Sequence, residues 1–464
     1  MNKALIIAGL IISLAWGCSL APQYTRPEPP VPAQWPGGTA YSEAGTGKPA
    51  AGIKWEDFFQ SEPLRTVIGI ALVNNRDLRV AALNVERYQA LYRIQRAELL
   101  PTIDAQGYFS KERVPGILTN SGHPKTVEIY NLNVGVSAWE LDFFGRIRNL
   151  KDAALEQYLA TEQAHRSAQI ALISGVANTY LTLAADRENL RLARSTLEAQ
   201  QSSYNIIKRR YEVGASSELE LRQAQTRLEA ARVDIARYTG LIAIDENSLN
   251  LLAGSNVSAA LLPEDLERAA ILRDSAPGLP SELLLRRPDI LEAEHLLRGA
   301  YANIGAARAA LFPRIALTTS IGTTSDQLTD LFKSGTNTWA FVPQIVVPIF
   351  DARSWSAYDV AKVDREILLA QYEKSIQSAF REVADALAQR GTIGNQLQAQ
   401  QALVTASAEA YRLSDLRYSK GIDSYLSVLD AQRSLYGAQQ GLIAVRLARA
   451  ANLITLYKVL GGGA

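Results

Sequence analysis

Two stretches of the sequence repeat each other, and they decide the fold. RRYEVGASSELELRQAQTRLEAA, at 209–231, recurs as LRYSKGIDSYLSVLDAQRSLYGA, at 416–438, an offset of 207 residues. In both stretches an Arg-Tyr pair precedes a glycine, Gly214 or Gly421, and matching leucines and alanines follow it. A period of roughly 200 residues is far longer than that of a solenoid, so it indicates a duplicated, domain-sized unit.

Each stretch lies within a helical segment that is predicted to turn back on itself. The first segment runs from about 144 to 211, breaks at Gly214 and returns to about 252, with no proline inside it. Apolar side chains recur every seven residues on both sides of each glycine, which is the signature of a coiled-coil seam. The seam positions are Leu190, Leu197, Tyr204, Tyr211, Leu221, Leu228, Ile235, Ile242, Leu249, Leu397, Val404, Tyr411, Tyr418, Val428, Leu435 and Leu442. Each copy therefore contains an antiparallel helical hairpin with its tip near 214 or 421.

A shorter helix opens each copy, and two strand-like segments follow it. The helices are predicted at about 61–100 and 281–312, each ended by a proline, Pro101 or Pro313. The strands are predicted at about 103–113 and 129–139 in the first copy, and at about 315–325 and 339–349 in the second. In the clearest strand, an apolar set alternates with a polar set that ends in a tryptophan. The apolar set is Tyr130, Leu132, Val134, Val136 and Ala138, and the other set is Asn131, Asn133, Gly135, Ser137 and Trp139.

Ten residues is the length of a tilted strand that crosses an outer membrane. The aromatic residues Tyr108, Trp139, Trp339 and Phe341 are candidates for the girdles of such a barrel. The same alternation fits a soluble hairpin packed on a core, so the pattern alone leaves both interpretations open. If the strands face lipid, four of them cannot close a barrel, and open edges are not tolerated there. Three chains would supply 12 strands around one axis.

The amino terminus has the pattern of a bacterial lipoprotein signal. Lys3 precedes an apolar run from Ala4 to Trp16, which is too short to span a bilayer, and Cys18, the only cysteine, follows it. Ordinary secretion with an incidental cysteine is the alternative interpretation. Ser19 takes the place at which an aspartate usually retains such lipoproteins in the inner membrane, so it favours the outer membrane. Prolines between 22 and 36 then favour an extended spacer.

The composition excludes several classes of function. The 464 residues carry 48 basic and 47 acidic side chains, a formal charge of +1, which gives no basic surface for nucleic acid. One cysteine and three histidines leave no clustered metal site, and no catalytic residue is assigned. A mean hydropathy of −0.05 excludes a polytopic helical membrane protein but not a β-barrel. The predicted domains are a signal peptide at 1–17, a lipidated spacer at 18–60, repeat 1 at 61–254, a linker at 255–280 and repeat 2 at 281–464.

Several segments together resemble the TolC-like outer-membrane factors, in the lipoprotein branch typified by OprM. The specific segments are CSLAPQY at 18–24, LDFFGR at 141–146, RPDI at 287–290, AE at 293–294, ANIGAARAA at 302–310 and LDAQR at 429–433. The resemblance covers nearly all of the chain from Cys18 to Gly463. It implies a mainly helical fold with a β-barrel portion: a homotrimer with a 12-stranded transmembrane barrel and a long coiled helical periplasmic tunnel.

The resemblance also implies a function and its partners. Such proteins are exit channels of tripartite efflux pumps, which conduct drugs or other toxic compounds from a periplasmic adaptor and an inner-membrane pump of the RND class. They catalyse no reaction and use no cofactor, apart from the covalent lipid expected on Cys18. The alternatives are a channel of the same fold for heavy-metal efflux or type I protein secretion, and a periplasmic adaptor lipoprotein. Two hairpins and a duplicated strand pair disfavour the adaptor.

In this family the tunnel closes at the hairpin tips, through apolar and acidic side chains. Leu426 and Asp430 are four residues apart and share a helix face, and Arg433 lies three residues further along it. Three copies of Leu426 would form an apolar constriction, three copies of Asp430 an acidic ring, and Arg433 would pair with an acid. Glu220 is the corresponding tip acid of repeat 1. An exposed, merely solvated Asp430 is the alternative interpretation.

The ends of the two hairpins are the predicted contacts with the adaptor, because both ends are expected to be exposed. The residues assigned to these tips are Gly214, Ser217, Gly421 and Ser424.

Overall fold

The computed structural model describes residues 19–41, 53–272 and 286–462. The predicted signal peptide, Cys18 and the helix start near 281 lie outside these residues. The chain forms two compact units, and each contains parts of both sequence repeats. Unit 1 comprises Met1–Glu28, Asn84–Thr161 and Glu292–Tyr372; unit 2 comprises Pro29–Leu83, Glu162–Leu291 and Glu373–Ala464. The sequence repeats are therefore not the compact units of the fold.

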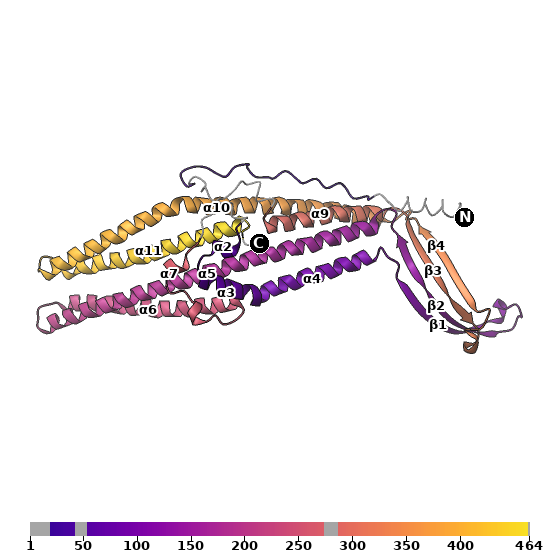
Figure 1. Ribbon diagram of the computed structural model, residues 1–464, viewed down its shortest axis with the longest axis horizontal. Coiled ribbons are helices and arrows are strands. Elements are labelled where there is room, and N and C mark those ends of the chain that lie inside the picture. Colours follow the sequence, from indigo (N-terminus) through magenta and orange to yellow (C-terminus); the bar gives the residue numbers. More distant parts are fainter. Residues whose placement is uncertain (1–18, 42–52, 273–285, 463–464) are drawn as a thin grey trace. The chain divides into compact units, whose positions relative to one another are not determined.

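Unit 1 contains one antiparallel sheet in the order β1-β2-β3-β4 (Figure 1). The strands are β1 (Ile103–Val114), β2 (Lys125–Leu141), β3 (Arg314–Ser325) and β4 (Asn337–Val346). Each repeat supplies one hairpin, and β2 pairs with β3 across the two repeats. The fourth strand ends at Val346, before the predicted end at 349.

The sheet has one apolar face, and a bulge in β2 preserves it. Val136 pairs with Thr319 and Trp139 pairs with Leu317, so two intervening residues of β2 oppose one residue of β3. Ala138 takes a positive φ of 52° there. The strict alternation predicted up to Trp139 is therefore wrong at its end: the bulge keeps Trp139 on the face of Val136. The face comprises Ile103, Ala105, Phe109, Tyr130, Leu132, Val134, Val136, Trp139, Leu141, Ile315, Leu317, Ile321, Trp339, Phe341 and Ile345.

Tyr108 lies on the opposite face of the sheet. It pairs with Asn131, whose side chain donates to Thr324 at 2.7 Å, and the other side chains there are mostly polar. The sequence suggested that Tyr108 shares an aromatic girdle with Trp139, Trp339 and Phe341. Because it lies on the other face of the sheet, it does not.

The apolar face of the sheet is exposed in the single chain. Trp339, Ile321 and Phe341 are 77%, 70% and 61% exposed. A soluble hairpin would bury such a face on a core, because large exposed apolar patches are rare on soluble monomers. The exposure therefore favours the membrane interpretation of the strands.

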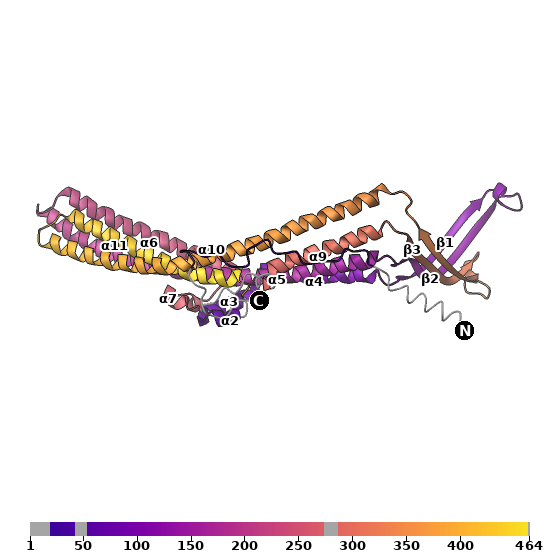
Figure 2. The same cartoon turned by 90° about the horizontal axis from the view of Figure 1, so that it is seen from above.

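Helices form most of the rest of the described chain, and four of them have residues in both units. They are α2 (Trp55–Phe58), α3 (Glu62–Asn74), α4 (Arg76–Ala97), α5 (Arg146–Glu212), α6 (Glu218–Ala253), α7 (Leu266–Ala269), α9 (Pro288–Ala309), α10 (Ala352–Ser419) and α11 (Tyr425–Val459). Short 3-10 turns lie at Gly116–Leu118, Ala259–Leu261 and Leu328–Asp330. In unit 2, α6 returns along α5, α11 returns along α10, and α6 contacts α11 (Figures 1 and 2).

The single helix predicted at 61–100 is interrupted at Asn75, which separates α3 from α4. The Asn75 side chain accepts from the Leu78 N–H at 2.9 Å, so it caps α4, and it donates to the Leu252 carbonyl at 3.0 Å. The backbone of Gly254 packs so closely here that an added Cβ would lie 2.3 Å from the Asn74 oxygen. Asparagine is a common N-cap residue. Because the Asn75 side chain also donates to Leu252, it holds the junction of α3 and α4 beside the end of α6.

The core of unit 2 joins the two hairpins to the short helices. Phe58 of α2 stacks on Tyr457 of α11 with a centroid separation of 4.0 Å, and the Tyr457 hydroxyl donates to the Ile53 carbonyl at 2.8 Å. An 18-residue stretch of α5 is apolar enough to span a membrane, but 61% of it is buried in the protein. Its hydrophobicity is therefore explained by this core.

The RPDI motif joins α9 to the end of α11. The buried Arg287 donates to the Val459 carbonyl at 2.9 Å, to Asp289 at 2.6 Å and to Glu382 of α10 at 2.8 Å. The last carbonyls of a helix lack intrahelical partners. Arg287 therefore caps α11, and the two carboxylates balance its charge.

Candidate functional site at the hairpin tips

The two hairpin tips turn through the same backbone motif. Gly214 and Gly421 have φ of 72° and 71°, a region that glycine enters without steric cost. After Gly421, the Ile422 N–H donates to the Arg417 carbonyl at 3.0 Å, and after Gly214 the Ala215 N–H donates to the Arg210 carbonyl at 2.7 Å. Together with the glycine N–H bonds, this is the Schellman motif that ends many helices. The repeated glycine thus has the same structural cause in both copies.

The helices that leave the tips begin differently. Ser217 caps α6 and accepts from the Glu220 N–H at 3.2 Å, and Glu220 also contacts Ser216. Ser424 precedes α11 but makes no side-chain cap. Ser427 stands where Glu220 stands in repeat 1, so the side-chain cap and the acid that follows it are present only in repeat 1.

A small apolar cluster lies under the tips and joins both hairpins within unit 2. Its buried members are Ile207, Ala224, Tyr425, Val428 and Leu429, and partly buried Tyr204, Leu221, Tyr411 and Tyr418 pack against it. Most of these are predicted seam residues. Tyr425 is only 3% exposed, so its side chain is not an exposed part of the tip. Burial raises the pKa of Tyr425 to about 12, which keeps its hydroxyl neutral.

A polar contact also joins the two hairpins. Arg210 of α5 donates to the Tyr418 hydroxyl of α10 at 2.8 Å, and its guanidinium lies 5.3 Å from the centre of the tyrosine ring. Burial and the charge of Glu220 raise the pKa of Tyr418, although Arg210 opposes this. Sequence reasoning did not find this contact, since nothing in either stretch indicates which residue of the other hairpin lies opposite.

Three of the predicted gate residues, Leu426, Asp430 and Arg433, share the exposed side of α11, which carries Tyr425 on its buried side. Leu426 is 60% exposed. Arg433 contacts Asp430 at 2.5 Å between Nη2 and Oδ1, and both side chains are 63% exposed. The structure therefore brings Asp430 and Arg433 together on one helix face, with Leu426 one turn before Asp430. Glu220 is part of the other hairpin tip and is partly buried.

The predicted tip residues Gly214, Ser217, Gly421 and Ser424 are all exposed. One further ion pair shapes the second tip: Arg417 donates to Asp423 through Nε at 2.5 Å and Nη2 at 3.2 Å. This pair closes the turn of repeat 2 within its own hairpin.

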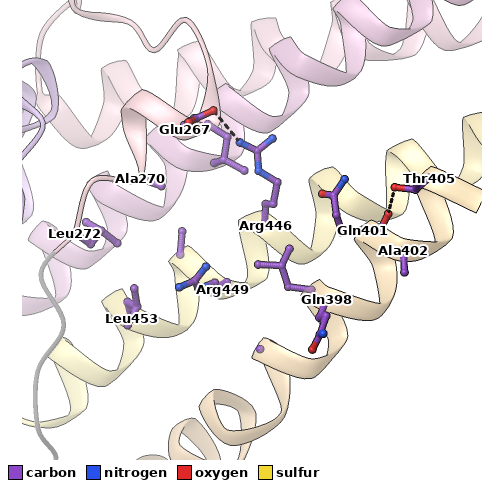
Figure 3. A pocket seen from close by; sticks show the side chains of 14 residues that line it. Glu267, Ala270, Leu272, Gln398, Gln401, Ala402, Thr405, Arg446, Arg449 and Leu453 are labelled. Atoms are coloured by element: carbon purple, nitrogen blue, oxygen red, sulfur yellow. Dashed lines mark hydrogen bonds and ion pairs between the residues drawn. The ribbon is translucent and has the colours of Figure 1, made fainter. Parts of the chain in front are cut away.

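Unit 2 also has a cavity of about 860 Å³ between α7, α10 and α11 (Figure 3). Leucine and alanine side chains line much of it, and Arg446 lies 3.7 Å from Glu267. None of its lining residues is serine, cysteine or histidine. In the part of the chain that the structure describes, no three His, Cys, Asp or Glu side chains gather as metal ligands.

Comparison with known proteins identifies the family. The model of the outer membrane efflux protein family matches residues 67–255 and again 279–462, once in each repeat. This chain belongs to the outer membrane efflux protein family. The toluene efflux pump outer membrane protein TtgC of Pseudomonas putida is 49% identical over 466 residues, which cover all of this chain and 96% of that protein.

Solved structures agree with this assignment. A membrane protein of Pseudomonas aeruginosa is 40% identical, with a TM-score of 0.91 over 96% of this chain and all of that one. The open state of the MtrE outer membrane channel of Neisseria gonorrhoeae is 37% identical, with a TM-score of 0.86 over 96% of this chain and 98% of that one. The predicted TolC-like fold, mainly helical with a β-barrel portion, is confirmed. So is the predicted class of function, an outer membrane efflux protein.

Proposed function

We propose that this efflux protein is the lipid-anchored, homotrimeric exit channel of a tripartite pump. It conducts drugs or other toxic compounds passively and catalyses no reaction. The observation that carries this proposal is the four-stranded sheet with an exposed apolar face, in a chain of this family. Four strands leave two unpaired edges, at β1 and β4, and lipid does not tolerate unpaired backbone groups. Three chains, joined β4 to β1, remove every edge and make 12 strands.

The lipid anchor rests on the sequence pattern that ends at Cys18. A diacylglyceryl group there would gain about 0.8 kcal/mol for each buried methylene. It would hold the amino terminus in the outer membrane, as Ser19 favours. No further cofactor is needed for passive conduction.

The gate of this channel is formed by α11. In a trimer with α11 toward the axis, Leu426 supplies an apolar ring and Asp430 an acidic ring that attracts cations. Arg433 holds each Asp430 in place, as the 2.5 Å contact supports. The Arg210–Tyr418 bond then holds the second hairpin against the first in the closed state, and Glu220 is the tip acid of the first hairpin.

The exposed tips are the docking site of the periplasmic adaptor, which connects the channel to an inner-membrane pump of the RND class. Gly214, Ser217, Gly421 and Ser424 form the accessible ends of the two hairpins. The relative that is named for toluene efflux supports small toxic compounds as substrates over metals. Heavy-metal efflux and type I protein secretion remain alternative uses of the same channel.

Single-channel conductance in planar bilayers tests the gate. Replacement of Leu426→Ala with Asp430→Ala should raise the conductance several-fold, because it removes both rings. The matched control is Leu219→Ala with Gln223→Ala, the same positions of repeat 1, which should leave conductance unchanged. Equal conductance of the gate variant and the control would refute the assignment.

A further inference from the structure

The carboxylate of Glu294 on α9 is buried in unit 1 and binds the amino-terminal segment. Its side chain is 3% exposed. Arg26 donates to it twice, at 3.1 and 2.6 Å, the Tyr24 hydroxyl donates at 3.1 Å, and Arg298 donates at 2.6 Å. Burial disfavours the charged form of Glu294, but the hydrogen bonds from the two arginines outweigh it and hold the pKa of this carboxyl below its usual range.

Aromatic contacts add to this site. The Tyr24 ring meets the Tyr301 ring edge-on at 5.4 Å, and the Arg298 guanidinium lies 5.0 Å from the centre of the Tyr24 ring. Arg26 and Tyr24 are thus held by charge, hydrogen bonding and ring packing together. We call residues 19–26 the strap.

The start of the strap is fixed by a second set of contacts. The Ser19 hydroxyl donates to the Asn149 amide oxygen of α5 at 2.8 Å. Gly305 of α9 lies so close to the strap that an added Cβ would be 2.7 Å from the Ala21 Cβ and 2.6 Å from the Asn149 nitrogen. Only a glycine at 305 leaves room for the strap, which accounts for this glycine within a helix.

These contacts lie where the helices meet the strands. Asn149 is in the first turn of α5, shortly after β2 ends, and Gly305 is near the end of α9, shortly before β3 begins. Ser19, the residue after Cys18, is therefore fixed beside the helix-side end of the sheet in unit 1.

We propose that the strap positions the lipid anchor, so that the acyl chains on Cys18 and the apolar face of the sheet enter the same membrane together. Glu294 is a positioning residue in this arrangement, because it acts through Tyr24 and Arg26. The inference rests on the proposed lipid anchor, and it adds that the anchor works only at a fixed place relative to the strands.

The physical advantage is a short tether. With the strap bound, the anchor is one residue from a fixed point. Without it, the next ring contact along the chain is Trp35 on Phe380, so the tether between the anchor and a held residue becomes longer. Effective concentration falls steeply with tether length, roughly as its −3/2 power. A freed anchor thus holds the sheet at the membrane surface much less effectively.

The first test uses the full-length protein in cells labelled with radioactive palmitate. Glu294→Ala should be lipidated normally but form the protease-resistant outer-membrane form on the order of tenfold more slowly. The matched control is Glu156→Ala, which removes the 2.6 Å contact between Glu156 of α5 and His295 of α9 without touching the strap. This control should assemble at the normal rate. Equal slowing of both variants would overturn the proposal, because helix destabilisation alone would then explain the effect.

The second test changes only the tether. Four residues, Ser-Gly-Ser-Gly, are inserted between Cys18 and Ser19, so that a serine still follows the cysteine, and in a control between Gly37 and Gly38, where an added Cβ meets nothing within 4 Å. The first insertion should slow assembly about tenfold while helix content, measured by circular dichroism, stays normal. The control insertion should leave both the assembly rate and the helix content unchanged. Normal assembly of the first insertion would overturn the strap inference alone, whereas absence of palmitate from the unaltered protein would overturn the lipid anchor itself.

Discussion

The two hairpin tips have the same backbone turn, but different side-chain contacts stabilise it. Arg417 of repeat 2 forms a two-pronged ion pair with Asp423 in its own turn. In repeat 1 the position that matches Asp423 is occupied by Ser216, which has no charge. The counterpart of Arg417, Arg210, therefore donates to Tyr418 of the other hairpin. One substitution between the repeats thus converts a contact within a hairpin into a contact between hairpins.

The buried faces of the two tips differ in the same way. Tyr425 and Leu429 of α11 are buried, while their counterparts Glu218 and Arg222 of α6 are charged and pair with each other on the surface. Repeat 2 therefore supplies three of the five buried members of the apolar cluster, and repeat 1 supplies the other two. In the proposed gate, this asymmetry would let the second hairpin move against the first, since the contacts to be broken are few and identifiable.

Of the variants that test this difference between the tips, Tyr425→Ala is expected to lower the local stability most. Truncation of a buried aromatic side chain leaves a cavity and costs about 3 kcal/mol. Glu218→Ala at the matching place in repeat 1 should cost only a few tenths of a kcal/mol, because exposed ion pairs contribute little. Hydrogen exchange of the amides around both tips measures the local opening free energy. Similar protection in the two variants would contradict the asymmetry.

The sequence predicts this region well where the determinants are local. The seam positions Tyr204, Tyr411 and Tyr418 follow from the seven-residue period, and Gly214 and Gly421 follow from the need for a positive φ. These features depend on residues close together along the chain.

The sequence fails where a contact joins distant segments or a regular period is interrupted. Trp139 changes face through a bulge that is set by the pairing with β3, and Asn75 ends a helix because α6 ends beside it. Arg210 and Tyr418 meet across 208 positions of the chain. Alternation and propensity contain no information about such partners.

Arg210→Ala should have the next largest effect. It leaves the Tyr418 hydroxyl without its donor and weakens the attachment of the two hairpins by about 1 kcal/mol. The fraction of time spent open, measured in planar bilayers, should rise about fivefold, the factor that corresponds to that free energy. Arg417→Ala breaks only the pair with Asp423, so it should leave the open fraction nearly unchanged. A larger effect from Arg417→Ala would show that the turn of repeat 2, and not the contact between hairpins, controls opening.

A pair of acids marks a second difference between the repeats, away from the tips. The carboxyl groups of Asp186 on α5 and Asp245 on α6 interact with each other, whereas the matching positions of repeat 2 hold Ile393 and Asn452. The Asn452 amide donates to the Ala386 carbonyl at 2.9 Å. Burial, and then the charge of Asp186, raise the pKa of Asp245 to about 6.

The raised pKa makes the stability of the first hairpin depend on pH. The folded state holds this proton more tightly than the unfolded state, whose aspartate pKa is about 3.9. The stabilisation is therefore complete below about pH 4 and is lost as the pH rises through 6. Asp245→Asn reproduces the residue of repeat 2 and removes the repulsion, so it should stabilise the hairpin at pH 7.5 by about 0.5 kcal/mol after screening by solvent, and not at pH 4.

Hydrogen exchange along α5 and α6 at both pH values measures this effect. Glu229→Gln on α6, which loses only an exposed pair with Arg232, is the control and should show no such dependence. Arg237, whose charge favours ionisation of Asp186, remains in place in both variants. A stabilisation by Asp245→Asn that is equal at pH 4 and 7.5 would mean that amide packing, and not the shared proton, separates the two repeats at this position.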